Sequence, residues 1–245
     1  MTGPLRIHLA GTMSLEHDGT LVPETRLPSR QGRLAFAMLV AERERALSKE
    51  ELADELWAGE PPRAWEVALR AIVSKLRGVL AGVRLDQGSI AYAFGCYQLR
   101  LPPDAWVDLE AATDAVHRAE TAFRQGDRPG AMGWALVANA IARRGFLPGE
   151  DGPWASGRRR QLRDVRIRAL ECRAQVQLEQ GLPDEAVRDL RIVLDLEPFR
   201  ETAYRLAMRA HVLAGNPAEA VRTFERCRST IAAELGTDPS AETEA

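Results

Sequence analysis

Cationic and hydroxyl side chains recur at helical spacing between residues 63 and 77. At about 100° per residue, Arg63, Arg70, Ser74 and Arg77 fall in one narrow stripe of a helix. An arginine guanidinium is a rigid fork of donors that matches phosphate oxygens and the edge of guanine, and a serine hydroxyl can bond to several bases. This stripe therefore has the chemistry of a surface that contacts nucleic acid.

The other side of the same segment is apolar, which predicts a helix from about Arg63 to Leu80 that packs on a core. One broad arc holds Trp65, Ala68, Leu69, Ile72, Val73, Leu76, Val79 and Leu80. The small Ala71 and the cation Lys75 lie beside the polar stripe. An ordinary amphipathic helix also has one wet face, so the flanking elements must decide between the two interpretations.

The flanking residues supply the other parts of a winged helix-turn-helix. Residues 48–51, Ser-Lys-Glu-Glu, have the form of a capping box, and a short helix through Trp57 follows them. Residues 59–62, Gly-Glu-Pro-Pro, must end that helix before the cationic one begins. Alternating apolar residues at 83–92 and 95–101 then predict a hairpin at the distance expected of a wing.

Strands are also predicted ahead of these helices. The runs at 5–9 and 13–15 alternate apolar and polar residues, and residues 17–20 have the composition of a turn. Because Pro102-Pro103 closes the series, residues 1–103 are assigned to an α+β winged helix-turn-helix domain that binds DNA.

In such a domain the second helix of the helix-turn-helix, here the one predicted from about Arg63 to Leu80, enters the major groove with its outer side. Small residues and long donors on that side meet base edges. The candidates for contact with base edges are Arg70, Ala71, Ser74 and Arg77, with Ala71 placed to meet a thymine methyl. The candidates for phosphates, which set the register without reading sequence, are Arg63, Lys75 and Arg84. On this hypothesis, replacing Arg77 by alanine relaxes the sequence preference.

The second part of the chain contains an internal repeat. Residues 181–188, Gly-Leu-Pro-Asp-Glu-Ala-Val-Arg, match residues 215–222, Gly-Asn-Pro-Ala-Glu-Ala-Val-Arg, at an offset of 34 residues. That offset is the tetratricopeptide period, with one helix-turn-helix in each repeat. A weaker third copy lies at 126–131. Residues 104–245 are therefore assigned to an all-α, tetratricopeptide-like domain, and the whole chain to a mainly α fold.

Bulk composition places few further limits on function. The formal net charge of −2 means that a DNA-binding surface must be a local patch. The three cysteines are far apart and the four histidines are scattered, so neither a disulfide framework nor a metal site is predicted. No signal segment and no apolar run of membrane-spanning length is found, which predicts a cytoplasmic protein with no membrane partner.

The sequence lacks several common enzymatic motifs. Neither Lys49 nor Lys75 follows a glycine, as a phosphate-binding loop requires, and no HExxH, GxSxG or GxGxxG pattern occurs. The abundant acidic residues are of the kind that form solvated helix faces. We therefore expect no catalytic activity and no cofactor.

Several runs together resemble the Streptomyces antibiotic regulatory protein family. In the first half the resemblance lies in Leu47–Trp57, Pro61-Pro62, Ala68-Leu69 and Val73–Arg77. In the second half it lies in 144–148 ahead of Trp154, in 197–201 and in 234–240. Members of this family join an OmpR-type winged helix to a bacterial transcriptional activation domain, and the resemblance covers essentially the whole chain.

The resemblance implies a transcriptional activator, commonly of a gene cluster for secondary metabolism such as antibiotic biosynthesis. Such a protein binds directly repeated promoter sites in double-stranded DNA, often as a pair of protomers, and recruits the RNA polymerase holoenzyme. By the same resemblance, Ser74, Lys75 and Arg77 are DNA-reading positions of the helix predicted from about Arg63 to Leu80, which is the third helix of such a domain.

One feature departs from the family pattern. Many relatives carry a basic or polar wing tip, whereas no cation occurs here from Ser89 to Leu99. An alternative function follows, in which the helical domain is a scaffold for a protein or ligand and the winged helix no longer binds DNA. Salt dependence discriminates between the two, because contacts to phosphates weaken steeply as salt rises.

Overall fold

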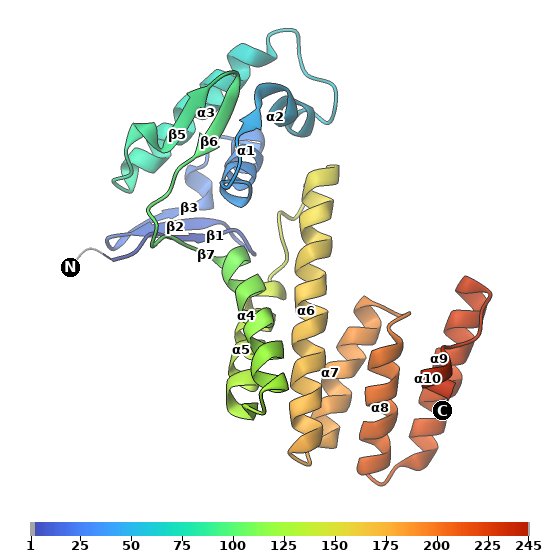
Figure 1. Cartoon of the computed structure of the whole chain (residues 1–245). Coiled ribbons are helices and arrows are strands. Elements are labelled where there is room, and N and C mark those ends of the chain that lie inside the picture. Colours follow the sequence, from blue (N-terminus) through green and yellow to red (C-terminus); the bar gives the residue numbers. More distant parts are fainter. Residues whose placement is uncertain (1–2, 245) are drawn as a thin grey trace. The chain divides into compact units, whose positions relative to one another are not determined.

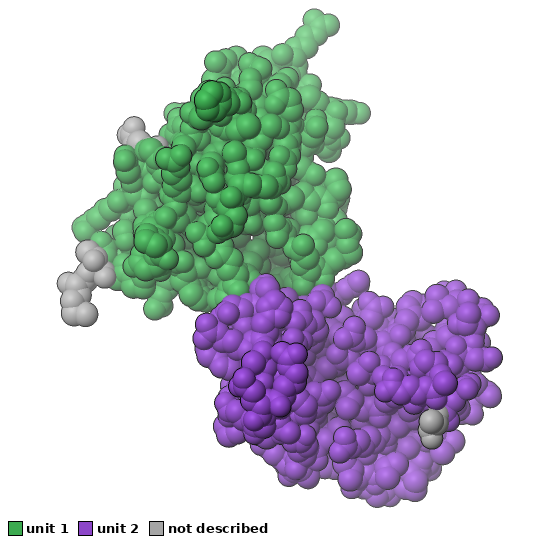
Figure 2. Space-filling model, in the orientation of Figure 1, with its two compact units in different colours: residues 1–111, 144–162 green, residues 112–143, 163–245 purple. Residues whose placement is uncertain are grey.

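The computed structural model describes residues 3–244, which form two compact units (Figures 1 and 2). The first unit comprises the residues up to Ala111 together with Arg144–Leu162. The second comprises Ala112–Arg143 and the residues from Arg163 onward.

A four-stranded sheet lies at the start of the first unit. Its strands are ordered β3-β2-β1-β7, where β1 is Arg6–His8, β2 is Ser14–His17, β3 is Thr20–Pro23 and β7 is Trp106–Val107. The predicted turn at 17–20 is confirmed, because His17 pairs with Thr20 across a two-residue loop. Strand β7 runs parallel to β1. The interdomain boundary expected after residue 103 therefore falls just before a strand of this sheet.

Three helices follow, α1 (Arg30–Ala41), α2 (Lys49–Leu56) and α3 (Trp65–Gly82) (Figure 1). The capping box is confirmed in part, because Ser48 Oγ accepts a hydrogen bond from the Glu51 N–H at 3.0 Å. Helix α3 begins two residues later than predicted and ends two residues later. Its start is delayed because residues 63 and 64 form a turn, in which Pro62 O accepts from Trp65 N at 2.9 Å.

A second sheet of three short strands is ordered β4-β6-β5. Strand β4 is Leu47–Ser48, β5 is Ile90–Ala93 and β6 is Cys96–Leu99. The hairpin is confirmed, but its first strand is shorter than the predicted 83–92. Val83 caps α3, and a short 3-10 helix, η2, occupies Gln87–Ser89. Apolar alternation at 83–85 therefore reflects the burial of Val83 and Leu85 and not a strand.

The segment Arg144–Leu162 packs within the first unit through polar contacts that are distant in sequence. Trp154 Nε1 donates to the Glu42 carboxylate at 2.9 Å, and Arg158 pairs with the same carboxylate. The buried Glu150 accepts from Arg33 at 3.1 Å. The Arg158-Arg159-Arg160 run in this segment is therefore partly engaged within the unit.

The second unit is built from helical hairpins. Its helices are α4 (Asp108–Arg124), α5 (Arg128–Ala142), α6 (Pro153–Glu179), α7 (Pro183–Leu196), α8 (Glu201–Leu213), α9 (Pro217–Leu235) and α10 (Ala241–Glu244), of which α4 and α6 begin in the first unit. The buried residues shared by the helices are mostly small, with alanine recurring at the contacts.

The repeated motif forms the same turn three times. Gly126, Gly181 and Gly215 have φ values of 84°, 73° and 74°, the left-handed region in which glycine is favoured. At each position the glycine N–H donates to the carbonyl three residues earlier, and the next N–H donates to the carbonyl five residues before it. This is the Schellman ending of a helix, so the weak copy at 126–131 is a structural equivalent of the other two.

Candidate nucleic-acid interface

The outer face of α3 carries four of the predicted site residues. Arg70, Ala71, Ser74 and Lys75 are all exposed, at positions i, i+1, i+4 and i+5 of one helix side. The opposite side is held by Leu69, Val73, Leu76 and Leu80, each at most 1% exposed. Neither Arg70 nor Lys75 forms an ion pair or hydrogen bond with another residue of 3–244. Their charges are therefore available to a ligand.

Arg77 is placed differently from the other members of the stripe. Its guanidinium donates from Nε and from one terminal nitrogen to the carbonyl of Ile90, at 3.2 and 2.7 Å. The side chain is half-buried between α3 and the first strand of the wing. The guanidinium of Arg77, which was expected to contact a base, thus donates hydrogen bonds to the backbone of the wing in this structure.

Arg63 and Arg84 flank α3 at its two ends. Arg63 is exposed in the turn before the helix. Arg84 follows the helix with a φ of 60°, its side chain is 74% exposed, and one guanidinium nitrogen lies 3.8 Å from Asp18. The structure brings neither one onto the exposed patch of Arg70 and Lys75, and both remain candidates for contacts with flanking phosphates.

A cavity of about 280 Å³ lies beside α3 and the wing and is lined by residues of both. Its lining is Lys49, Glu66, Arg70, Val73, Arg77, Tyr92 and Tyr97. The two tyrosine rings lie 4.8 Å apart between centroids. Arg70 therefore faces two regions, the outer side of the helix and a polar and aromatic hollow beside the wing.

Lys49 in this cavity was not anticipated as a site residue. Its Nζ lies 3.0 Å from Glu66, and the hydrogen bond to Glu66 raises the pKa of Lys49 while it lowers the pKa of Glu66. The only sequence signal is its place as the first helical residue after the capping serine, which sets it at the start of α2. Glu66 neutralises this cation locally.

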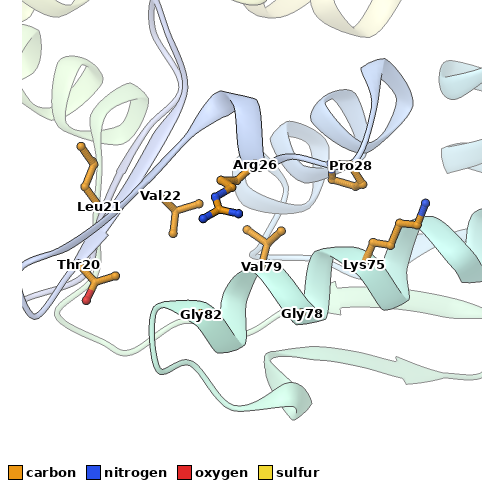
Figure 3. Close-up of a pocket in the computed structure, with 9 residues that line it drawn as sticks. All are labelled: Thr20, Leu21, Val22, Arg26, Pro28, Lys75, Gly78, Val79 and Gly82. Atoms are coloured by element: carbon orange, nitrogen blue, oxygen red, sulfur yellow. The ribbon is translucent and has the colours of Figure 1, made fainter.

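A larger cavity of about 600 Å³ adjoins the second half of α3 (Figure 3). It lies between that helix and the residues around β3, and Figure 3 labels its lining residues. Arg26 and Lys75 are its two cations, and both are exposed. A Cβ added at Gly78 or Gly82 would meet nothing within 4 Å, so the helix surface is low here and open to a bulky ligand. Arg26 is a second cation that sequence reasoning missed.

The wing ends in a two-residue turn, Phe94-Gly95, between Ala93 and Cys96. The Phe94 side chain is fully exposed, with a φ of 50°. The Gly95 carbonyl accepts from the Lys49 N–H at 3.1 Å, which ties the tip to the start of α2. The neutral wing expected from the sequence thus presents one aromatic ring at its end.

Residues 3–244 contain neither a cluster of metal-ligating side chains nor a membrane-spanning helix. No group of three His, Cys, Asp or Glu side chains among them is placed to hold a metal ion. No helix in this described part is long and apolar enough to cross a bilayer.

Comparison with known proteins identifies regulators as relatives. The chain is 33% identical over 238 residues to the regulatory protein AfsR of Streptomyces coelicolor, covering 97% of this chain and 23% of that protein. It is 27% identical to the transcriptional regulatory protein EmbR of Mycobacterium tuberculosis, covering 94% and 59%. It is 23% identical to the regulatory protein DnrI of Streptomyces peucetius, covering 97% and 88%. The chain thus spans less than a quarter of AfsR.

The fold is shared with a solved structure. Mycobacterium tuberculosis EmbR, in complex with a low-affinity phosphopeptide, superposes with a TM-score of 0.88 at 24% identity, covering 98% of this chain and 63% of that one. This likeness confirms the expected mainly α fold class, a winged helix-turn-helix with a helical domain. The model of the bacterial transcriptional activator domain matches residues 107–245, more than half of the chain. The family expected from the resemblance is therefore confirmed, and the chain belongs to the bacterial transcriptional activator domain family.

Proposed function

We propose that this protein is a sequence-specific DNA-binding transcriptional regulator. The observation that carries the proposal is the exposed face of α3, where Arg70, Ala71, Ser74 and Lys75 point outward. Helix α2, which Ser48 caps, precedes α3 as the first helix of the helix-turn-helix. A helix that presents long donors and small residues in this way matches the major groove in width and in chemistry. The regulators among its relatives support the same function.

The contacts divide by geometry. Arg70, Ala71 and Ser74 lie on the first turns of α3 that a recognition helix uses for base edges. Lys75 beside them, and Arg63 and Arg84 beyond the two ends of α3, are the proposed phosphate contacts. Arg77 acts through the wing, because its guanidinium fixes Ile90.

The two parts of the chain have separate tasks in this proposal. Residues 1–103 bind double-stranded promoter DNA at direct repeats, as a pair of protomers. Residues 104–245 contact the RNA polymerase holoenzyme and so activate transcription, with a secondary-metabolite gene cluster as the target. The protein acts in the cytoplasm at the chromosome, and it is a regulator and not an enzyme.

A selection experiment tests this function. Genomic fragments that bind the purified chain are sequenced, and the best fragment is then titrated across a salt series. We expect enrichment of direct repeats about one helical turn apart, together with a steep loss of affinity as salt rises. Folded protein that enriches no sequence at low salt would favour the alternative, a helical scaffold for a protein or ligand whose neutral wing and winged helix serve other contacts.

A further inference from the structure

Two hairpin loops of the first unit share the same backbone conformation but carry different residues at their first position. The loop Asp18-Gly19 has φ values of 50° and 74°, and the loop Phe94-Gly95 has values of 50° and 80°. Each is a two-residue loop with both central residues left-handed, a geometry that selects Asn, Asp or Gly at its first position. Asp18 follows this preference, whereas Phe94 does not.

Within residues 3–244, no packing contact compensates for the phenylalanine. Its side chain is 104% exposed, so it buries no apolar area and packs on no neighbour. A bulky residue at positive φ is strained, and strain of this kind is retained where a residue has a task outside the fold. An exposed ring that is retained in spite of this strain is a candidate for contact with another molecule.

The surroundings of the ring match a nucleic-acid groove. Its neighbours in the turn, Ala93 and Gly95, are small, so a single ring projects from a narrow tip. The tip is continuous with the cationic cavity, because Gly95 bonds to the backbone of Lys49 and Tyr92 lines the cavity with Arg70. From Ser89 to Leu99 no acidic side chain would repel a phosphate.

We propose that Phe94 is an apolar wedge that enters the minor groove beside the site read by α3. The minor groove is about 6 Å wide, and proteins that insert an apolar ring there partly unstack a base step and bend the duplex. The wedge takes the place of the wing cation that this chain lacks. This inference rests on the proposed function, since it assumes that α3 binds DNA.

Two substitutions of Phe94 test the wedge. Phe94→Asn suits the left-handed turn, so this variant should unfold at a higher denaturant concentration than the parent while its DNA affinity falls roughly tenfold. Phe94→Leu retains an apolar wedge and should retain most of the affinity. Because the ring contacts no phosphate, the dependence of log K on log salt should keep its slope in both variants. A gel assay with permuted fragments should show less bending with Phe94→Asn.

The outcomes separate the wedge from the proposed function. Val221→Gln, which removes an exposed apolar side chain from α9, should leave DNA binding unchanged. A parent protein that binds no DNA would overturn both proposals. A parent protein that binds DNA, with Phe94→Asn equal to it in affinity and bending, would overturn the wedge alone, and the ring would then serve a protein partner.

Discussion

Arg77 on α3 donates two hydrogen bonds to the carbonyl of Ile90, at 3.2 and 2.7 Å, and so joins the recognition helix to the wing. Ile90 is 1% exposed and begins β5. The carbonyl receives its donors from a side chain 13 residues earlier. The guanidinium of Arg77 is therefore a direct polar link between α3 and the first strand of the wing.

Replacing Arg77 by alanine should destabilise the first unit and weaken DNA binding on all sequences alike. The loss of a charged donor to a buried carbonyl costs about 1 kcal/mol at a half-buried position. Denaturation with urea measures this cost, and binding to a panel of site variants measures preference. Arg77→Lys keeps one donor group, so its stability and its DNA affinity should lie between those of the parent and those of Arg77→Ala. A change of preferred bases in Arg77→Ala would restore a base-reading role to this residue.

Replacing Ser74 by alanine and replacing Lys75 by alanine should affect different properties of DNA binding, namely base discrimination and overall affinity. A hydroxyl at a base edge carries sequence information, so Ser74→Ala should lower discrimination between bases with little effect on salt dependence. Loss of a phosphate contact should make Lys75→Ala bind all sequences more weakly and reduce the salt slope by about one. Arg209→Ala, at an exposed position of α8, is the matched control for charge. Identical effects of Ser74→Ala and Lys75→Ala would contradict this division.

The carboxylate of Glu66 should lower the affinity of the protein for DNA. It lies 3.0 Å from Lys49 and lines the same cavity as Arg70. Glu66→Gln removes the anion and leaves the cation free for a phosphate, so affinity should rise and the salt slope should steepen by about one. Glu50→Gln, an exposed carboxylate one residue from Lys49, is the control. Unchanged binding in Glu66→Gln would show that no phosphate approaches Lys49.

Local rules explain what could be predicted from the sequence. Capping at Ser48, the turn at 17–20 and the glycine turns of the repeats each depend on a few adjacent residues, so composition and spacing were enough to find them. The exposed half of the α3 stripe could be found for the same reason, because helical periodicity fixes which side chains share a face.

Contacts between residues far apart in sequence could not be predicted. Arg77 had the right spacing for the outer face, but its direction is set by a carbonyl of the wing. Lys49 reaches the site because α2 begins beside Gly95. The segment Arg144–Leu162 joins the first unit through Glu42, more than a hundred residues earlier. In each case the partner is chosen by tertiary packing, which no local pattern records.

Glu120 in the second unit should contribute a pH-dependent part of stability. Arg168 forms two hydrogen bonds of 2.7 Å with its carboxylate and holds the pKa of Glu120 below its ordinary value of 4.5. A depressed folded pKa stabilises the protein fully above the unfolded pKa, and this stability is lost as pH falls through the folded pKa. The difference in unfolding free energy between the parent and Glu120→Gln should therefore be constant from pH 7 to 5 and shrink below about pH 4.5. A difference that persists unchanged at pH 3 would exclude this pair as its source.

Glycine-to-alanine substitutions should have opposite signs at two positions of the second unit. Gly181 has a φ of 73°, so alanine there is strained and should destabilise the protein by about 1 kcal/mol. Gly133 is an exposed residue within α5, and a Cβ there would meet nothing within 4 Å, so alanine should stabilise the helix by roughly 0.5–1 kcal/mol. Chemical denaturation of the two variants measures both effects in the same protein. Because both glycines are exposed and the same substitution is made at each, the opposite signs follow from the backbone conformation, which is helical at Gly133 and left-handed at Gly181. A Gly181→Ala variant as stable as the parent, or more stable, would contradict the assignment of Gly181 to a helix-ending turn of the repeat.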